Sequence, residues 1–152
     1  MDLHPDFRDL LAELVHEGVS YVVLGGYAVG HHAKPRATKD LDLLVAGGDN
    51  LARVASALKR FGAPSSVVEA ARHLAENEIV YLGVEPVRVD ILRSAAGIET
   101  DRVLERAEHV VVGGLNIAVI GLDDLIANKK AAGRRQDLAD VELLERVRAR
   151  RR

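Results

Sequence analysis

The chain of 152 residues lacks cysteine and tryptophan, and its aromatic side chains are limited to two phenylalanines and three tyrosines. The lack of cysteine excludes disulfides, zinc-thiolate sites and a thiol nucleophile. So few aromatic rings argue against a protein that holds single-stranded nucleic acid by stacking bases on an aromatic platform. No run of 18 apolar residues is present, so we expect no membrane span. The N-terminus has no signal-peptide pattern, and we therefore expect a cytoplasmic location.

The net charge is only −2, but the charges are unevenly distributed along the chain. Residues 129–152 contain nine basic and four acidic residues, a net charge of +5, which leaves −7 for the first 128 residues. Apolar residues make up 48% of the sequence, enough for a hydrophobic core. The length predicts one domain over residues 1–152, with a basic C-terminal helix or tail over residues 136–152.

Hydrophobic spacing predicts an α/β chain with a mixed sheet flanked by helices. Strands are predicted at residues 21–24, 41–45, 78–82, 87–92, 109–112 and 115–120. Helices are predicted at residues 5–17, 27–33, 51–61, 98–107, 123–132 and 136–150, with Asn50 as an N-cap, while residues 62–77 fit neither pattern. The glycine-containing links at 83–86 and 113–114 are too short for parallel crossovers, so we expect antiparallel pairs within the sheet.

Three acidic residues stand out because they lie within predicted strands. Asp40 and Asp42 are two residues apart, so their carboxylates project from the same face of the strand while Leu41 faces the other way. Two anions this close repel unless a cation lies between them, and Mg²⁺ suits such oxygen ligands. Asp90 lies in a later strand, and if the two strands are neighbours the three carboxylates form a candidate site for two metal ions.

Gly25 and Gly26 end the first predicted strand, 14 positions before the first acidic residues. The missing side chains would let a triphosphate approach the backbone, and a helix that starts here would offer free N–H groups to it. A phosphate-binding turn followed by a metal-binding pair indicates nucleotide chemistry.

This combination resembles the nucleotidyltransferase superfamily, whose catalytic fold is shared with DNA polymerase beta. The string GGYAVGHHAKPRATKDLDLLV is similar to AbiEii-like and toxin-type minimal nucleotidyltransferases, in which Arg-x-Thr-x-Asp-x-Asp recurs; here Arg36 and Thr38 precede Asp40 and Asp42. The string LDDLIANKKAAGRRQDLADVELL also resembles that family at Lys129, Arg134, Asp137 and Asp140. The resemblance covers about residues 18–145, the core of the expected domain.

The resemblance implies a Mg²⁺-dependent enzyme that moves an NMP group from an NTP to a hydroxyl acceptor. Asp40, Asp42 and Asp90 would hold two Mg²⁺ ions, and Asp90 would help to deprotonate the acceptor. Gly25 and Gly26 would bind the triphosphate, with Arg36 and Lys129 neutralising its charge, Thr38 nearby, and Asp137 orienting Lys129 or lining the site.

The acceptor is left open by the sequence. The toxin-type resemblance implies tRNA or protein as acceptor and a cognate antitoxin as partner. A small-molecule nucleotidyltransferase, such as one that modifies an antibiotic, is the alternative, because the acidic main body would attract a cationic drug. A third alternative is a non-catalytic nucleotide-binding or regulatory partner with the same fold. The arginine run at 146–152 is interpreted as a solvated tail rather than an RNA contact.

His31 and His32 are adjacent in the segment between the glycines and the acids. Such a pair is able to bind a metal, but adjacent residues rarely supply the geometry alone. We interpret them as loop histidines without a role.

Overall fold

The computed structural model describes residues 1–38 and 40–151, which fold around one six-stranded sheet of order β3-β4-β2-β1-β6-β5. The strands are β1 (Tyr21–Leu24), β2 (Asp40–Val45), β3 (Ile79–Leu82), β4 (Arg88–Leu92), β5 (Glu108–Val112) and β6 (Leu115–Val119). Two neighbouring pairs, β2 with β4 and β1 with β6, are parallel, and the other three pairs are antiparallel. The expected mixed sheet is therefore confirmed.

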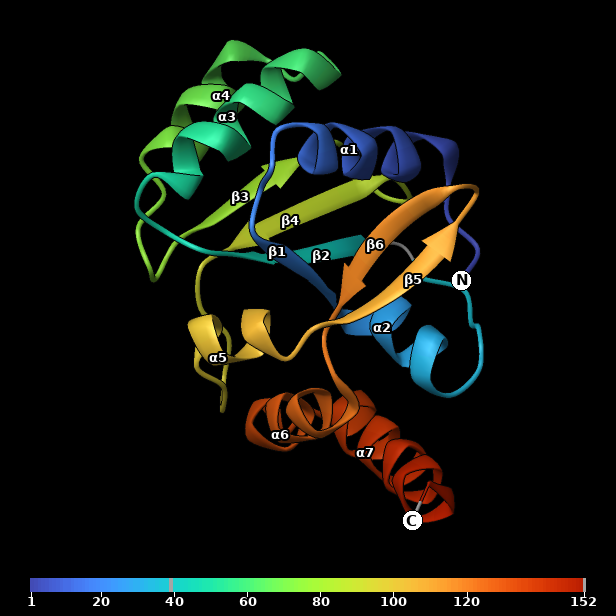
Figure 1. The fold of residues 1–152 in the computed structure, drawn as a ribbon. Helices are drawn as coiled ribbons and strands as arrows, with labels where there is room; N and C mark the ends of the chain where they lie inside the picture. Colours follow the sequence, from blue (N-terminus) through green and yellow to red (C-terminus); the bar gives the residue numbers. More distant parts are fainter. Residues whose placement is uncertain (39, 152) are drawn as a thin grey trace.

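Helices cover both faces of this sheet (Figure 1). They are α1 (Pro5–His16), α2 (Gly25–His32), α3 (Asn50–Phe61), α4 (Ser65–Arg72), α5 (Thr100–Glu105), α6 (Leu122–Ala132) and α7 (Arg135–Arg150). In Figure 1, α1, α3 and α4 lie above the sheet, whereas α2, α5, α6 and α7 lie below it. The result is a three-layer arrangement in which α2, α6 and α7 share one face.

Burial follows the apolar pattern of the sequence. All four residues of β1 are buried, as its unbroken apolar run predicts for a central strand. In β2, Leu41 and Leu43 are fully buried while Asp40 and Asp42 are only partly buried, so the strand separates a core face from a polar face. In α1, Phe7 and Leu14 belong to a fully buried stripe that packs into the same core.

Some local predictions from the sequence, concerning Asn50 and the helices near residues 62–77 and 98–107, differ from the structure. Asn50 does not cap α3; its side-chain oxygen accepts a hydrogen bond from the Ser20 N–H at 2.8 Å, and its amide donates to the Ala46 carbonyl at 2.8 Å. The unassigned region 62–77 contains α4, and the helix expected over 98–107 is shortened to α5.

Within residues 1–38 and 40–151, we find no helix with the length and apolar character needed to cross a bilayer.

Candidate functional site

The parallel pairing of β2 with β4 brings the three predicted acidic residues together. Asp42 lies directly opposite Asp90, and Asp40 lies opposite Arg88. Since side chains alternate between the faces of a strand, all four project from the same face of the sheet. We refer to Asp40, Asp42 and Asp90 as the strand carboxylates.

Arg88 is hydrogen-bonded to two of the strand carboxylates. Its guanidinium donates to both carboxylate oxygens of Asp90, at 2.9 Å from Nε and 3.1 Å from Nη2, and to Asp40 Oδ2 at 3.1 Å. It also lies over the ring of Tyr81, 5.3 Å from the centroid. One guanidinium thus bridges two of the three acids, and Asp42 receives no hydrogen bond from it.

In this arrangement the ionised form of Asp42 is destabilised. Burial, reinforced by repulsion from Asp90 and Asp40, raises the pKa of Asp42 to about 6. Asp40 also has an unsatisfied polar atom, because its Oδ1 is buried without a hydrogen-bond partner among the residues that the structure describes. A buried oxygen without a donor and a carboxylate with a raised pKa both indicate a site that lacks positive charge.

The glycine turn lies against these acids. Gly25 has a φ of +66° and opens α2, and a Cβ at this position would overlap Asp42 Oδ2. A Cβ at Gly26 would lie 2.8 Å from Thr38 Oγ1. Glycine is therefore required at both positions by close approach, and in the described chain the first N–H groups of α2 receive no side-chain cap.

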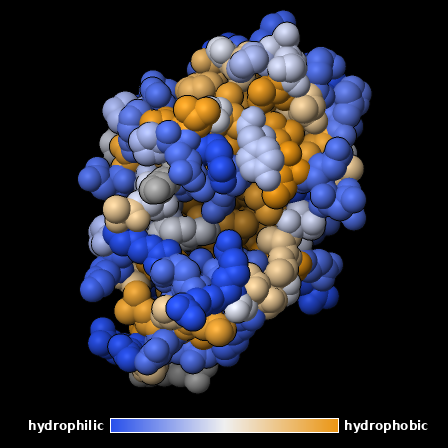
Figure 2. All heavy atoms as spheres, turned by 180° about the vertical axis from the view of Figure 1, so that it is seen from behind, coloured by the Kyte–Doolittle hydropathy of each residue, from blue (hydrophilic) through white to orange (hydrophobic). Residues whose placement is uncertain are grey.

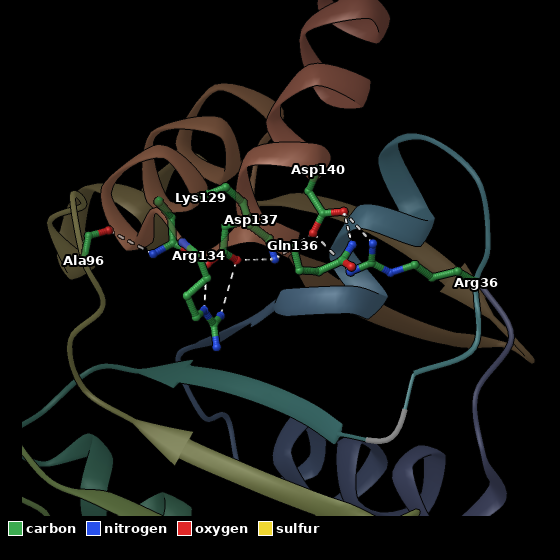
Figure 3. Close-up of polar contacts among 8 residues, drawn as sticks. Arg36, Ala96, Lys129, Arg134, Gln136, Asp137 and Asp140 are labelled. Carbon is green, nitrogen blue, oxygen red and sulfur yellow. Dashed lines mark hydrogen bonds and ion pairs between the residues drawn. The ribbon is translucent and has the colours of Figure 1, made fainter.

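A second group of charges lies where α6 meets α7. Lys129 Nζ is 3.1 Å from Asp137 Oδ1 and 3.0 Å from Asp140 Oδ2, and all three residues are buried. Figure 3 shows Arg134 and Arg36 reaching Asp137 and Asp140 from opposite sides. We call these five residues the helix cluster. Lys130, the residue after Lys129, instead contacts Glu145 and is half exposed, so the two lysines have different environments.

The acids of the helix cluster are electrostatically satisfied. Burial alone would raise the pKa of Asp137, but hydrogen bonds from Arg134 and Lys129 outweigh it, and the pKa lies below its ordinary value. The same balance lowers the pKa of Asp140, where Arg36 and Lys129 are the donors. Arg36 approaches Asp140 with both terminal nitrogens, which gives the bidentate geometry typical of strong arginine–carboxylate pairs.

The strand carboxylates and the helix cluster face a common hollow of about 300 Å³. Its lining includes most of the residues predicted from the sequence: Gly25, Gly26, Arg36, Thr38, Asp40, Asp42, Lys129 and Asp137. Asp90 is not part of this lining but lies beside Asp42 in the sheet register. Arg36 of this lining is bonded to Asp140, 104 positions later in the chain.

No functional role was predicted for Gln136, Asp140 or Arg88, which also belong to this site. Gln136 lines the hollow, and its side-chain amide donates to Asp140 Oδ1 at 3.1 Å. Asp140 follows Asp137 by three positions, a spacing that places both on one helix face and that had already matched the family string. Arg88 precedes Asp90 by two positions, so the period of the strand was the signal that places them together.

The donors on the strands suit a hard divalent cation. They are carboxylate oxygens, one of them is buried without a donor, and the only close positive group among residues 40–42 and 88–90 is Arg88. Mg²⁺ prefers oxygen ligands and is commonly held by one or two carboxylates together with substrate phosphates. By donor type, Asp40, Asp42 and Asp90 would suit such an ion.

Comparison with solved structures gives two related folds. The aminoglycoside-resistance enzyme ANT(2'')-Ia, solved in complex with adenylyl-2''-tobramycin, matches with a TM-score of 0.59 at 13% identity, covering 94% of this chain and 91% of that chain. Its solution structure matches with a TM-score of 0.60 at 12% identity over 95% and 88% of the two chains. A Thermotoga maritima protein assigned to the nucleotidyltransferases matches with a TM-score of 0.58 at 16% identity over 94% and 88%.

These matches establish the nucleotidyltransferase fold, as the sequence resemblance predicted. A search of curated protein sequences finds no match. A family described as "Nucleotidyl transferase of unknown function (DUF2204)" matches residues 4–152, nearly the whole chain. The protein is therefore a member of this nucleotidyl transferase family.

Proposed function

We propose that this protein transfers an NMP group from an NTP to a hydroxyl acceptor in a Mg²⁺-dependent reaction. The observation that carries the proposal is the meeting of three carboxylates from β2 and β4 with the glycine-lined start of α2. Asp40, Asp42 and Asp90 would hold the metal, because they offer oxygen donors that one arginine does not neutralise.

The triphosphate would lie against the N-terminus of α2. The backbone at Gly25 and Gly26 is free of side chains, and the helix dipole favours an anion there. Arg134 is largely exposed, and in Figure 3 its side chain points from the helix cluster toward the strand layer. Arg134 and the partly exposed Arg36 would contact phosphate oxygens, while the buried Lys129 supplies positive charge from behind.

In the reaction, the acceptor oxygen forms a bond to the α-phosphorus, the bond from that phosphorus to the bridging oxygen breaks, and pyrophosphate leaves. Bound Mg²⁺ supplies charge stabilisation for the attacking and leaving oxygens. Asp90 would accept the acceptor proton, and Asp42 would be ionised when the cation is bound. The helix cluster would fix the nucleotide, since its own ion pairs hold Asp137 and Asp140 in place.

The structure offers one observation on the acceptor. Arginines near the end of α7 are engaged within the chain: Arg146 with Glu142 at 2.8 Å, Arg148 with Asp123 at 3.2 Å. Figure 2 shows hydrophilic side chains, interspersed with hydrophobic ones, over the lower part of the back face, at the height of α6 and α7. Arg152, the last member of the run, lies outside the described residues. Paired arginines offer less charge to RNA phosphates, which favours a small cationic acceptor over tRNA.

The similarity of fold to ANT(2'')-Ia agrees with a small acceptor, because that enzyme was solved with an adenylylated aminoglycoside and has a chain of similar extent. The toxin-type alternative, with tRNA or protein as acceptor and an antitoxin partner, remains supported by the Arg-x-Thr-x-Asp-x-Asp string at residues 36–42. We place the small cationic acceptor first.

The test is transfer of label from each of the four α-³²P-labelled NTPs, with and without Mg²⁺, to aminoglycosides, to total tRNA and to protein. The wild-type chain should label one acceptor class only when Mg²⁺ is present. Asp42→Asn should reduce the rate by at least about 10³-fold, as expected for loss of a group that stabilises the transition state. The exposed Asp101→Asn variant is the matched control and should keep full activity. Equal rates for Asp42→Asn and wild type would refute the assignment, and absence of transfer with retained NTP binding would favour the non-catalytic alternative.

A further inference from the structure

A group of metal-ligating side chains lies at the opposite end of α2 from the glycine turn. His31 and His32, the last two residues of α2, meet Glu108, the first residue of β5. His31 Nε2 is 3.6 Å from Glu108 Oε1, and His32 Nδ1 is 3.8 Å from Glu108 Oε2. The expectation that these histidines lie in a loop is therefore wrong, because α2 continues through them; β5 supplies the carboxylate beside them.

His32 is held in a defined orientation with one nitrogen unused. Its side chain is fully buried, and Nε2 lies 2.7 Å from the Ile120 carbonyl oxygen, so Nε2 carries the hydrogen that is donated. The lone pair is then on Nδ1, which is buried and has no hydrogen-bond partner in the part of the chain that the structure describes. Metal-binding histidines commonly donate their second ring N–H to a backbone carbonyl, which fixes the tautomer and the ring.

An imidazole nitrogen with a free lone pair, such as His32 Nδ1, is the form that coordinates a metal.

The three ligand atoms have the separations that one ion requires after a small adjustment. They all lie within 4.8 Å of one another, whereas ligands about 2.0–2.1 Å from a tetrahedral zinc ion are about 3.4 Å apart. Each histidine is already close to that separation from one oxygen of Glu108: His31 Nε2 is 3.6 Å from Oε1 and His32 Nδ1 is 3.8 Å from Oε2, so the carboxylate would have to turn or to bind through both oxygens. We propose that His31, His32 and Glu108 form a binding site for one divalent transition-metal ion, with Zn²⁺ as the reference ion.

A hollow lies beside the carboxylate of the site. Glu108, but neither histidine, lines this hollow of about 590 Å³ together with Arg151, whose Nη1 lies 3.9 Å from Glu108 Oε2. Arg151 is half exposed, so it is able to withdraw when a cation arrives, and water from the hollow would complete the coordination. Imidazole nitrogen with a single carboxylate favours zinc-like ions over Mg²⁺, which distinguishes this site from the strand carboxylates.

A bound ion would join the C-terminal end of α2 to β5. The N-terminal end of the same eight-residue helix carries Gly25 and Gly26, so the metal would fix the helix from the end that is remote from the glycine turn. The site does not depend on the proposed reaction, because it shares no residue with the strand carboxylates or the helix cluster.

The test is zinc binding by the full chain, free of any purification tag, with Mg²⁺ in excess to occupy oxygen-ligand sites. Equilibrium dialysis followed by elemental analysis should find one zinc per wild-type chain. His31→Gln and Glu108→Gln alter partly exposed side chains, so the variants should fold, and each should weaken zinc binding at least tenfold. His109→Ala, an exposed neighbour on β5, should bind zinc like the wild type.

Two further measurements separate a built site from surface binding. Co²⁺ should give the strong visible absorption of a four-coordinate ion in the wild type and lose it in Glu108→Gln. Zn²⁺ should raise the melting temperature of the wild type and of Asp42→Asn equally, but not that of His31→Gln. No zinc bound by the wild type, or equal zinc bound by His31→Gln and wild type, would overturn the proposal.

Discussion

The strand carboxylates and the helix cluster lie at the same hollow, yet aspartates of the two groups have pKa values shifted in opposite directions. The pKa of Asp42 is raised to about 6, whereas the pKa values of Asp137 and Asp140 are lowered. Burial acts in the same direction on all three, so burial does not explain the difference. The neighbouring charges do: Asp90 and Asp40 repel Asp42, whereas cations donate hydrogen bonds to Asp137 and Asp140.

The helix cluster contains three cations and two acids. Asp137 is bonded to Lys129 and Arg134, and Asp140 is bonded to Lys129 and Arg36. The strand carboxylates are three acids with Arg88 as their hydrogen-bonded cation. The acids of the helix cluster are therefore balanced by cations of the chain, whereas the strand carboxylates outnumber their hydrogen-bonded cation. The contrast agrees with a structural role for the helix cluster and with the proposed role of the strand carboxylates in binding a metal ion.

The largest effect on stability should come from breaking the helix cluster at its centre. Lys129→Met would leave Asp137 and Asp140 buried without the ammonium that contacts both. We expect a loss of about 3–5 kcal/mol in the free energy of unfolding, the range for removing one partner of a buried ion pair. Lys130→Met, at an exposed pair, should cost less than about 1 kcal/mol. Urea denaturation of both variants measures the difference, and equal losses would remove the distinction between the two lysines.

Removing a charge from the strand carboxylates should instead increase the free energy of unfolding. Asp42→Asn removes a carboxylate whose ionisation is unfavourable, and without Mg²⁺ at pH 8 it should stabilise the fold by on the order of 1–2 kcal/mol. A raised folded-state pKa means that the wild type gains protons, and stability, as pH falls through 6. The stability gap between variant and wild type should therefore close near pH 4. Asp140→Asn should destabilise at pH 8, and stabilisation by both substitutions would break the comparison.

Mg²⁺ binding should depend on pH through the same carboxylate. Below about pH 6 a proton competes with the cation for Asp42, so affinity should fall up to tenfold per pH unit there. Above pH 7 the affinity should be nearly constant. Calorimetric titration of wild type from pH 5 to 8 measures this profile, and the same profile in Asp42→Asn would show that another group titrates.

The smallest effect should come from Arg88, the cation that the strand carboxylates already have. Arg88→Gln should lower the melting temperature slightly without Mg²⁺, because Asp40 and Asp90 lose their donor. The same change should increase Mg²⁺ affinity severalfold, since a competing positive charge is gone. Thermal melts across a Mg²⁺ series test both signs, and weaker Mg²⁺ binding would show that Arg88 positions the acids rather than competing for them.

Much of the fold was predictable because it depends on local periodicity. The apolar run at 21–24, the alternation at 40–45 and the short glycine links predicted the strands and the mixed sheet. The site was predictable where strand period and adjacency fixed geometry, as for Asp40 and Asp42. Asn50 could not be assigned correctly, because its partners Ser20 and Ala46 become neighbours only after β1 pairs with β2.

The remaining errors also concern contacts between distant segments. The meeting of His31 and His32 with Glu108 depends on how α2 packs beside the β5–β6 hairpin, which no local pattern encodes. The bidentate contact of Arg36 with Asp140 likewise joins a loop to a helix more than a hundred residues later. Local sequence patterns identify the residue types, whereas the packing of distant segments determines which residues contact each other.

The dependence of Lys129 on α7 has a consequence for synthesis on the ribosome. Asp137 and Asp140 are made after every strand of the sheet, so a nascent chain that has completed β6 and α6 still exposes a lysine with no acid to receive it. Premature termination before residue 137 would leave that charge uncompensated and would remove Asp137 from the lining of the hollow. Truncated products should thus be unstable as well as inactive, and proteolysis would remove them before they compete for nucleotide.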